Sequence, residues 1–232
     1  MSALDLVECA DEYRQCRERI VDLVAGVPAD TRVPACPDWT VHDLCAHLAG
    51  VTASLVAGQG PGADTQAWVD DHVERRRTRT LDELMAEWVD ASPAFEQMIA
   101  TQGTGVVVLL NDIVAHEHDL RGALDRPGGR DARGVALSLE LGRKLMERDL
   151  RRNDTLTVEM VADENTWTAG TGPTTLRLDL RGRPDATWEL FRVFGSRRSP
   201  AQLDRLPWGG EWRAVEHDVF HLPLPAYDLD DA

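Results

Sequence analysis

The chain has 232 residues, of which 43% are hydrophobic and 28% are charged, and it carries a formal net charge of −15 at pH 7. This length and composition are typical of a folded globular protein with one large domain or two modest ones. The negative charge would repel phosphate backbones and anionic membranes, so we expect neither nucleic acid nor a membrane as a partner. The sequence contains no apolar run of membrane-spanning length and no secretory signal at the N-terminus, which predicts a cytoplasmic location.

Amphipathic helices are predicted along the first part of the chain. Apolar residues recur there at steps of three and four residues, which predicts helices over about residues 3–27, 40–57, 80–100 and 106–124. Thr40 and Thr80 are expected N-caps, because Asp43 and Glu83 follow them at the capping-box spacing. We expect Pro93 to kink the third helix or to split it in two.

These helices predict the architecture of the N-terminal part. The segment 64–78, between the second and third helices, is expected to be partly helical. Four amphipathic helices joined by moderate loops are typical of an antiparallel bundle. Bundles of this kind commonly hold metal sites between facing helices.

The pattern changes near residue 150, after a further predicted helix at 133–152. Apolar residues then alternate along the chain, which predicts strands with one buried face that carry Leu156, Val158, Met160, Leu176, Leu178 and Leu180. A helix is expected at 184–194, before a Trp- and Pro-rich tail. We therefore predict an α+β fold with two domains, a helical one at 1–130 and a small α+β one at 131–232.

The four cysteines, Cys9, Cys16, Cys36 and Cys45, show neither a CxxC pair nor zinc-finger spacing. In a cytosolic protein they are expected to remain thiols, with buried packing as the favoured role. A catalytic thiol stays an open alternative. The tryptophans are interpreted as core and interdomain anchors rather than as stacking platforms.

The segment 111–124, NDIVAHEHDLRGAL, carries a candidate metal site. Asp112 and His116 stand one helical turn apart, so a carboxylate oxygen and an imidazole nitrogen can converge on one ion. His47 lies on the apolar stripe of the second helix and should face inward. A His47/Asp112/His116 set would suit zinc or another divalent transition metal and would leave a coordination position open, as in catalytic sites. The alternative is a pair of hydrogen-bonded core histidines with a chance Asp-x3-His spacing.

The residues around this site have less certain roles. Asp43 and Asp119 each lie one turn from a histidine and could accept a hydrogen bond that orients the imidazole, although a helix cap or a surface charge explains them equally well. Glu117 and His118 are expected to face elsewhere. Arg197 and Arg198 are candidate catalytic and cofactor-binding residues, since they could neutralise a carboxylate of a substrate or of a thiol cofactor. The alternative there is a solvated basic turn.

Three segments resemble the actinobacterial DinB-like family related to mycothiol-dependent maleylpyruvate isomerase. CPDWTVHDLCAHLAG is similar to its Pro-x-Trp-x-Val-x-Asp-Leu-x-x-His-Leu motif and contains His47. A second family motif is matched by Asp112, His116, Asp119, Leu120, Ala123 and Leu124. The family has glutamate where this chain has Asp112, whose side chain is one methylene shorter. TWELFRVFGSRRSPAQL is similar to a C-terminal segment in which a helix leads into a Gly-x-Arg turn.

The resemblance implies a DinB-like four-helix bundle with zinc or a similar ion on His47, Asp112 and His116. It also implies a low-molecular-weight thiol such as mycothiol as cofactor and a small electrophile as substrate, so that the protein would be an isomerase or an S-transferase. One alternative is a non-catalytic binding or regulatory protein with a degenerate metal site. Another is metal-dependent hydrolysis, for which Glu117 lies on the wrong helical face to act as base. A monomer or a homodimer is expected.

Overall fold

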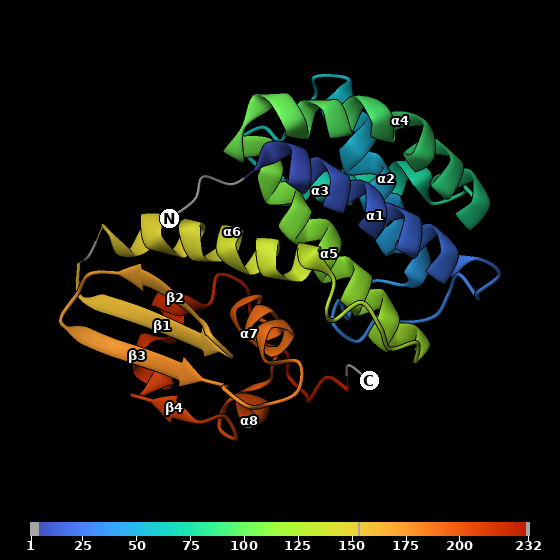
Figure 1. The fold of residues 1–232 in the computed structure, drawn as a ribbon. Helices are drawn as coiled ribbons and strands as arrows, with labels where there is room; N and C mark the ends of the chain where they lie inside the picture. Colours follow the sequence, from blue (N-terminus) through green and yellow to red (C-terminus); the bar gives the residue numbers. More distant parts are fainter. Residues whose placement is uncertain (1–4, 153, 231–232) are drawn as a thin grey trace. The chain divides into compact units, whose positions relative to one another are not determined.

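A computed structural model describes residues 5–152 and 154–230, with the backbone alone for residues 104–107 (Figure 1). The chain divides into two compact units, one formed by the described residues up to Pro127 and one formed by Gly128–Asp230. The first is helical and the second combines helices with a sheet, which confirms the predicted α+β fold class. None of the helices in the described ranges has the length and apolar character that crossing a bilayer requires.

The N-terminal unit is a four-helix bundle with one additional helix. Its helices are α1 (Leu6–Val24), α2 (Val41–Val56), α3 (Thr65–Arg76), α4 (Leu81–Gln102) and α5 (Thr104–Leu124). Helix α1 packs on α4 and α5, α2 packs on α4 and α5, and α3 packs on α2. The bundle therefore places α2 beside α5, the two helices that carry the candidate ligands.

The predicted helix starts are confirmed at α2 and α4. Thr40 and Thr80 are the N-caps, and both form capping boxes, with Asp43 and Glu83 respectively. Of the two outcomes expected for Pro93, a kink or a split, the split is wrong, because α4 continues through the proline. Trp88 and Phe95 are fully buried on either side of the proline, and this packing holds the two halves of the helix in one element despite the missing backbone hydrogen bond.

The cysteines all belong to the N-terminal unit and are free thiols. Cys9, Cys16 and Cys45 are fully buried, as the packing interpretation predicts, whereas Cys36 is only partly buried. Burial in apolar surroundings raises the pKa of Cys45 to about 12, so this thiol is unreactive at neutral pH.

The C-terminal unit contains a four-stranded sheet and several helices. Its main elements are α6 (Arg133–Leu150), β1 (Leu156–Ala162), β2 (Asn165–Gly170), β3 (Thr174–Asp179), α7 (Ala186–Phe194), α8 (Pro200–Leu203), β4 (Trp208–Gly209), a 3₁₀ turn (Trp212–Val215) and α9 (Glu216–Val219). The strand order is β2-β1-β3-β4, with β1 parallel to β3 and the other pairs antiparallel. The alternating residues predicted to face the core are buried in one cluster.

Candidate metal centre

Helices α2 and α5 bring the three predicted ligands together. One carboxylate oxygen of Asp112 lies 3.3 Å from Nε2 of His47, and the other lies 3.5 Å from Nε2 of His116. One potential ligand atom from each residue lies within 4.8 Å of those from the other two. Asp112 and His116 are neighbours because they are one turn apart on α5, whereas His47 reaches them only through the packing of α2. The carboxylate of Asp112 thus sits between two imidazoles.

The inward orientation predicted for His47 is confirmed. His47 is 5% exposed, and it lies in a run of buried residues on α2 that begins at Leu44. The Trp39 ring lies beside both imidazoles, with centroid distances of 5.1 Å to His47 and 6.0 Å to His116. Trp39 directly precedes the α2 cap, so the structure places it as a wall of this cluster, a position that its interpretation as a core anchor did not anticipate.

Asp119 orients one of the two imidazoles. Its Oδ2 lies 3.1 Å from Nδ1 of His116, and the carboxylate is buried. A proton on Nδ1 would be donated to Asp119, which leaves Nε2 of His116 directed at the Asp112 side with its lone pair available. Asp43 is part of a helix cap instead, because its carboxylate accepts hydrogen bonds from the backbone N–H and the hydroxyl of Thr40 at the start of α2.

The charges of the cluster balance one another. Burial alone would raise the pKa of Asp112 and lower that of His116. The facing imidazoles of His116 and His47 outweigh this for the carboxylate and hold the pKa of Asp112 well below its usual range. In turn Asp112 and Asp119 raise the pKa of His116 well above its ordinary value. In the metal-free protein a proton therefore occupies the site where a metal ion would bind.

The donor set and its spacing fit a divalent ion. Two imidazole nitrogens and one carboxylate oxygen are donors that zinc and related ions accept. Ligand atoms on a tetrahedral ion with bonds of about 2.0–2.1 Å lie about 3.3 Å apart. One oxygen of Asp112 lies 3.3 Å from Nε2 of His47 and the other lies 3.5 Å from Nε2 of His116, so the shorter aspartate side chain reaches both neighbours. Three protein donors would leave a fourth position open.

Cys36 adjoins this cluster, and the sequence patterns did not single it out as a site residue. Its sulfur lies 3.7 Å from Oδ2 of Asp119, and Cys36, His116 and Asp119 form a second group with metal-ligating atoms close together. The only signal in the sequence is its place at the start of the CPDW segment, four residues before the α2 cap. His116 belongs to both groups, with its Nε2 facing Asp112 and its Nδ1 facing Asp119.

His72 is a second residue that sequence reasoning missed, since the limits of its helix could not be read. Its ring is buried on α3, and its Nε2 has no hydrogen-bond partner in the described structure. Burial, then the charge of Arg76 and that of His47, lower the pKa of His72 to about 4. The imidazole is thus neutral at pH 7. A side chain at Gly50 of α2 would meet its Cβ at 2.7 Å, so this glycine permits the close approach of α3.

Glu117 faces away from the cluster, as predicted, and is bound to α1. It is fully buried, accepts two hydrogen bonds from Arg19 and two from Arg121, and also accepts one from the Cys16 thiol. Burial alone would raise the pKa of Glu117, but these donors lower it. His118 is likewise buried outside the two metal-competent groups.

Arg197 and Arg198 belong to the C-terminal unit, where both are buried. The interpretation as a solvated basic turn is therefore wrong. Arg198 forms a bidentate ion pair with Glu189, in which Nε and Nη2 lie 2.8 and 2.6 Å from the two carboxylate oxygens. Its guanidinium lies over the Trp188 ring. These contacts give Arg198 a role within its own unit, and a catalytic or cofactor-binding role for either arginine stays a prediction.

Comparison with known families finds a match for most of the helical N-terminal unit. Residues 13–121 match the family model of the mycothiol maleylpyruvate isomerase N-terminal domain. This range contains His47, Asp112 and His116, whereas the segment 187–203, with the third resemblance, lies outside it. No curated protein and no solved structure matches the chain. The match confirms the resemblance of this chain to the mycothiol-dependent maleylpyruvate isomerase family.

Proposed function

We propose that His47, Asp112 and His116 bind a divalent ion, with zinc as the expected metal. We further propose that the protein is a thiol-dependent isomerase or S-transferase for a small electrophile. The single observation that carries this proposal is the convergence of two imidazole nitrogens and one carboxylate, with one potential ligand atom from each residue within 4.8 Å of the other two. The match of residues 13–121 to a mycothiol-related domain supports the thiol as partner.

In this proposal the residues around the three ligands orient one imidazole and shield the site from water. Asp119 holds the proton of His116 on Nδ1 and so keeps Nε2 available to the ion. The Trp39 ring shields the two imidazoles on one side and limits access of water. When bound, the ion would lower the pKa of a thiol at its open position and so supply the thiolate nucleophile. A thiol that adds to the substrate and leaves gives isomerisation, and one that stays gives S-transfer.

A metal-free binding protein is the second candidate. The observation that favours it is that the Asp112 carboxylate contacts the imidazoles of both His47 and His116. The three residues can therefore partner one another with no ion between them. In that case the cluster would be a buried polar network that stabilises the pairing of α2 with α5. The shorter Asp112 in the family's glutamate position is consistent with this reading as well.

Elemental analysis separates the two candidates. The protein is purified without added metal, and its metal content is measured before and after supplementation with zinc. We expect about one ion per chain for the wild type and for His42→Ala, a control on the same helix whose ring is bound to the Arg79 carbonyl. His47→Ala, His116→Ala and Asp112→Asn should lose it, whereas Asp112→Glu should retain it. A wild type that never takes up metal would support the metal-free binding protein.

A second experiment addresses the reaction. Metal-loaded protein is incubated with mycothiol and a panel of small electrophiles, and products are identified by mass spectrometry. Isomers without bound thiol indicate isomerisation, and conjugates indicate S-transfer. Metal uptake without any product across a broad panel would favour a metal-binding protein without this activity.

A further inference from the structure

The two candidate ligand histidines differ in what faces their Nδ1 atoms. Nδ1 of His116 lies 3.1 Å from a carboxylate oxygen of Asp119. Nδ1 of His47 is buried and has no hydrogen-bond partner within the described structure. A histidine that binds a metal through one ring nitrogen almost always donates the N–H of the other to an acceptor, which fixes its tautomer and its orientation. An acceptor is therefore expected near Nδ1 of His47.

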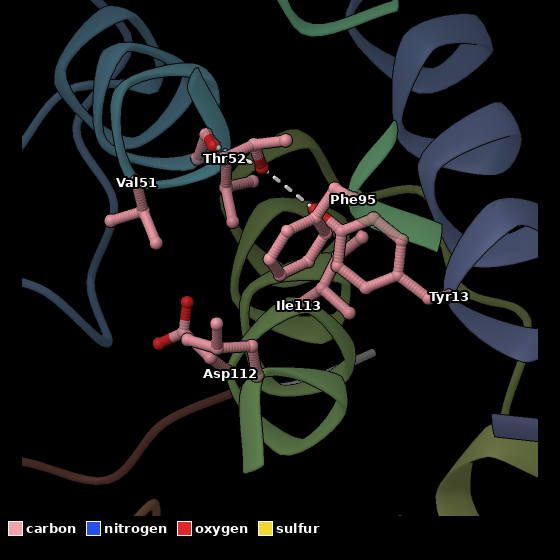
Figure 2. A pocket seen from close by; sticks show the side chains of 8 residues that line it. Tyr13, Val51, Thr52, Phe95, Asp112 and Ile113 are labelled. Atoms are coloured by element: carbon pink, nitrogen blue, oxygen red, sulfur yellow. Dashed lines mark hydrogen bonds between the residues drawn. The ribbon is translucent and has the colours of Figure 1, made fainter. Parts of the chain in front are cut away.

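The small pocket beside Asp112 does not supply this acceptor. It lies between α1, α2, α4 and α5, and His47 is not part of its lining. Besides Asp112, its polar side chains are Tyr13 and Thr52, whose hydroxyl oxygens are 2.8 Å apart and share a hydrogen bond (Figure 2). Asp112 itself faces the other ring nitrogen of His47. The partner of Nδ1 must come from another helix that packs on α2.

Helix α3 brings a second buried imidazole to the face of α2 that carries His47. Gly50 lies three residues after His47, and residues at this spacing share one face of a helix. A Cβ at Gly50 would lie 2.7 Å from Cβ and 2.8 Å from Cγ of His72, so the His72 side chain packs directly on the α2 backbone. His72 is 5% exposed, and its Nε2 has no partner among the described residues. His47 and His72 thus occupy one face of α2 about one turn apart.

The position of His72 is fixed by contacts that involve no metal ligand. Nη1 of Arg76 donates to the His72 carbonyl at 3.2 Å, and Nε and Nη2 of the same guanidinium bind the two carboxylate oxygens of Glu87 on α4 at 3.0 and 2.7 Å. The Trp68 ring packs edge-to-face on the His72 ring, with a centroid distance of 4.4 Å. Helix α3 therefore holds this imidazole against α2 whether or not an ion is bound.

One water can join the two buried nitrogens. It would accept the Nδ1 proton of His47 and donate to Nε2 of His72, since a neutral imidazole has one nitrogen that accepts. Two hydrogen bonds of about 2.9 Å span up to about 5.8 Å, close to the rise of about 5.4 Å in one helical turn. Buried waters typically occupy such places, where they join polar groups that otherwise have no partner.

We propose that His72 is a positioning residue for the candidate metal centre and that it accepts the Nδ1 proton of His47 through one buried water. This inference rests on the proposed function and adds to it a residue outside the three ligands. His72 would support His47 as Asp119 supports His116, so that both imidazoles present Nε2 to the ion. The site would then depend on α3, a helix that supplies no ligand.

Substitutions of His72 test this proposal through zinc affinity, measured by competition with a chromophoric chelator. His72→Leu removes the acceptor at similar volume, and we expect it to weaken zinc binding about 10- to 100-fold. His72→Gln should retain most of the affinity, because its amide oxygen can accept from the same water. Val73→Ala, which removes buried packing at the next position of α3, is the control and should bind zinc as the wild type does. Equal losses in all three variants, or no loss in His72→Leu, would overturn the inference.

The Nδ1 proton of His47 provides a readout that a loss of packing alone would not change. Long-range ¹H–¹⁵N NMR spectra of the zinc-loaded protein show which ring nitrogen carries the proton and how fast that proton exchanges with solvent. We expect a slowly exchanging proton on Nδ1 of His47 in the wild type, in His72→Gln and in Val73→Ala. The exchange should be several times faster in His72→Leu. The same exchange rate in all four proteins would contradict the bridge.

A crystal structure of the metal-free protein separates failure of this inference from failure of the proposed function. An ordered water within about 3.2 Å of both Nδ1 of His47 and Nε2 of His72 supports the bridge even if the protein takes up no metal. The lack of such a water, or a different acceptor on Nδ1 of His47, overturns the bridge even if zinc binding is established. Failure of the wild type to take up metal counts against the proposed function alone.

Discussion

Oδ2 of Asp119 lies 3.1 Å from Nδ1 of His116, so a buried carboxylate fixes which nitrogen of this imidazole carries the proton. We expect Asp119→Ala to weaken zinc binding by about 10- to 100-fold, because the imidazole loses its orienting acceptor. Zinc affinity is measured by competition with a chromophoric chelator.

Asp43→Ala is the matched control for this prediction. Asp43 also lies one turn from a candidate ligand, His47, but its carboxylate caps α2. Its removal should lower the free energy of unfolding by about 1 kcal/mol and leave zinc affinity unchanged once the protein is folded. If both variants lose affinity to the same extent, Asp119 has no special role in orienting His116.

Zinc affinity should rise with pH. In the metal-free protein the pKa of His116 is raised and that of Asp112 is lowered, because the two charged forms stabilise each other. His116 therefore contributes stability that is fully present below its unfolded pKa of about 6.5 and is lost as the pH rises through its folded pKa. Zinc must displace this proton, so binding should tighten between about pH 6 and 8 and release protons in a calorimeter. Affinity that is flat over this range would contradict the raised pKa.

Asp112 acts in the opposite direction. Its lowered pKa contributes stability that is present above its unfolded pKa of about 3.9 and is lost as the pH falls through its folded pKa. The free energy of unfolding of Asp112→Asn should therefore fall furthest below that of the metal-free wild type between about pH 4 and 6.5. In this range Asp112 and His116 are charged in both the folded and the unfolded protein. Urea unfolding of the two proteins as a function of pH measures this difference.

Glu117→Gln should destabilise the bundle by about 3 kcal/mol in urea unfolding. The fully buried carboxylate is the common partner of Arg19 and Arg121, and its removal leaves both guanidinium groups without their counter-charge. Glu74→Gln is the control, because its pair with Arg77 is exposed on both sides and should contribute less than about 1 kcal/mol. Equal effects of the two substitutions would show that the buried cluster adds little to stability.

Gly50→Ala should also be destabilising, although alanine is the better helix former. The new methyl group would lie 2.7 Å from Cβ of His72, so α3 would have to move. We expect a net loss of about 1–3 kcal/mol in urea unfolding, as for other overpacked cores. Gly60→Ala, where the nearest side-chain atom is Leu55 Cδ2 at 3.9 Å, should change stability by no more than about 0.5 kcal/mol.

The sequence was sufficient where local chemistry decides the structure. Thr40 and Thr80 could be recognised as caps because both partners of each capping box lie within one turn. The pair Asp112 and His116 follows in the same way from helical spacing. His47 could be added because its stripe had to be buried, and because the CPDW segment resembles a known motif.

The remaining parts of the site depend on contacts between elements that are distant in sequence. Cys36 reaches Asp119 across 83 residues, and His72 approaches Gly50 through the packing of α3 on α2. Neither residue lies on a periodic pattern that marks its neighbour. The sequence also left open whether Pro93 kinks or splits its helix, and α4 continues through the proline because tertiary packing outweighs a local preference that disfavours the helix.

His116 and Glu117 are consecutive on α5 but are held by different neighbours, His116 beside His47 of α2 and Glu117 by Arg19 of α1. Successive residues of a helix point about 100° apart, so these contacts fix α5 on two sides at once. Rotation of α5 about its axis would break one set of contacts or the other. The two candidate metal ligands of α5 are thereby held at a fixed angle about the helix axis that does not depend on an ion, as a preorganised site requires.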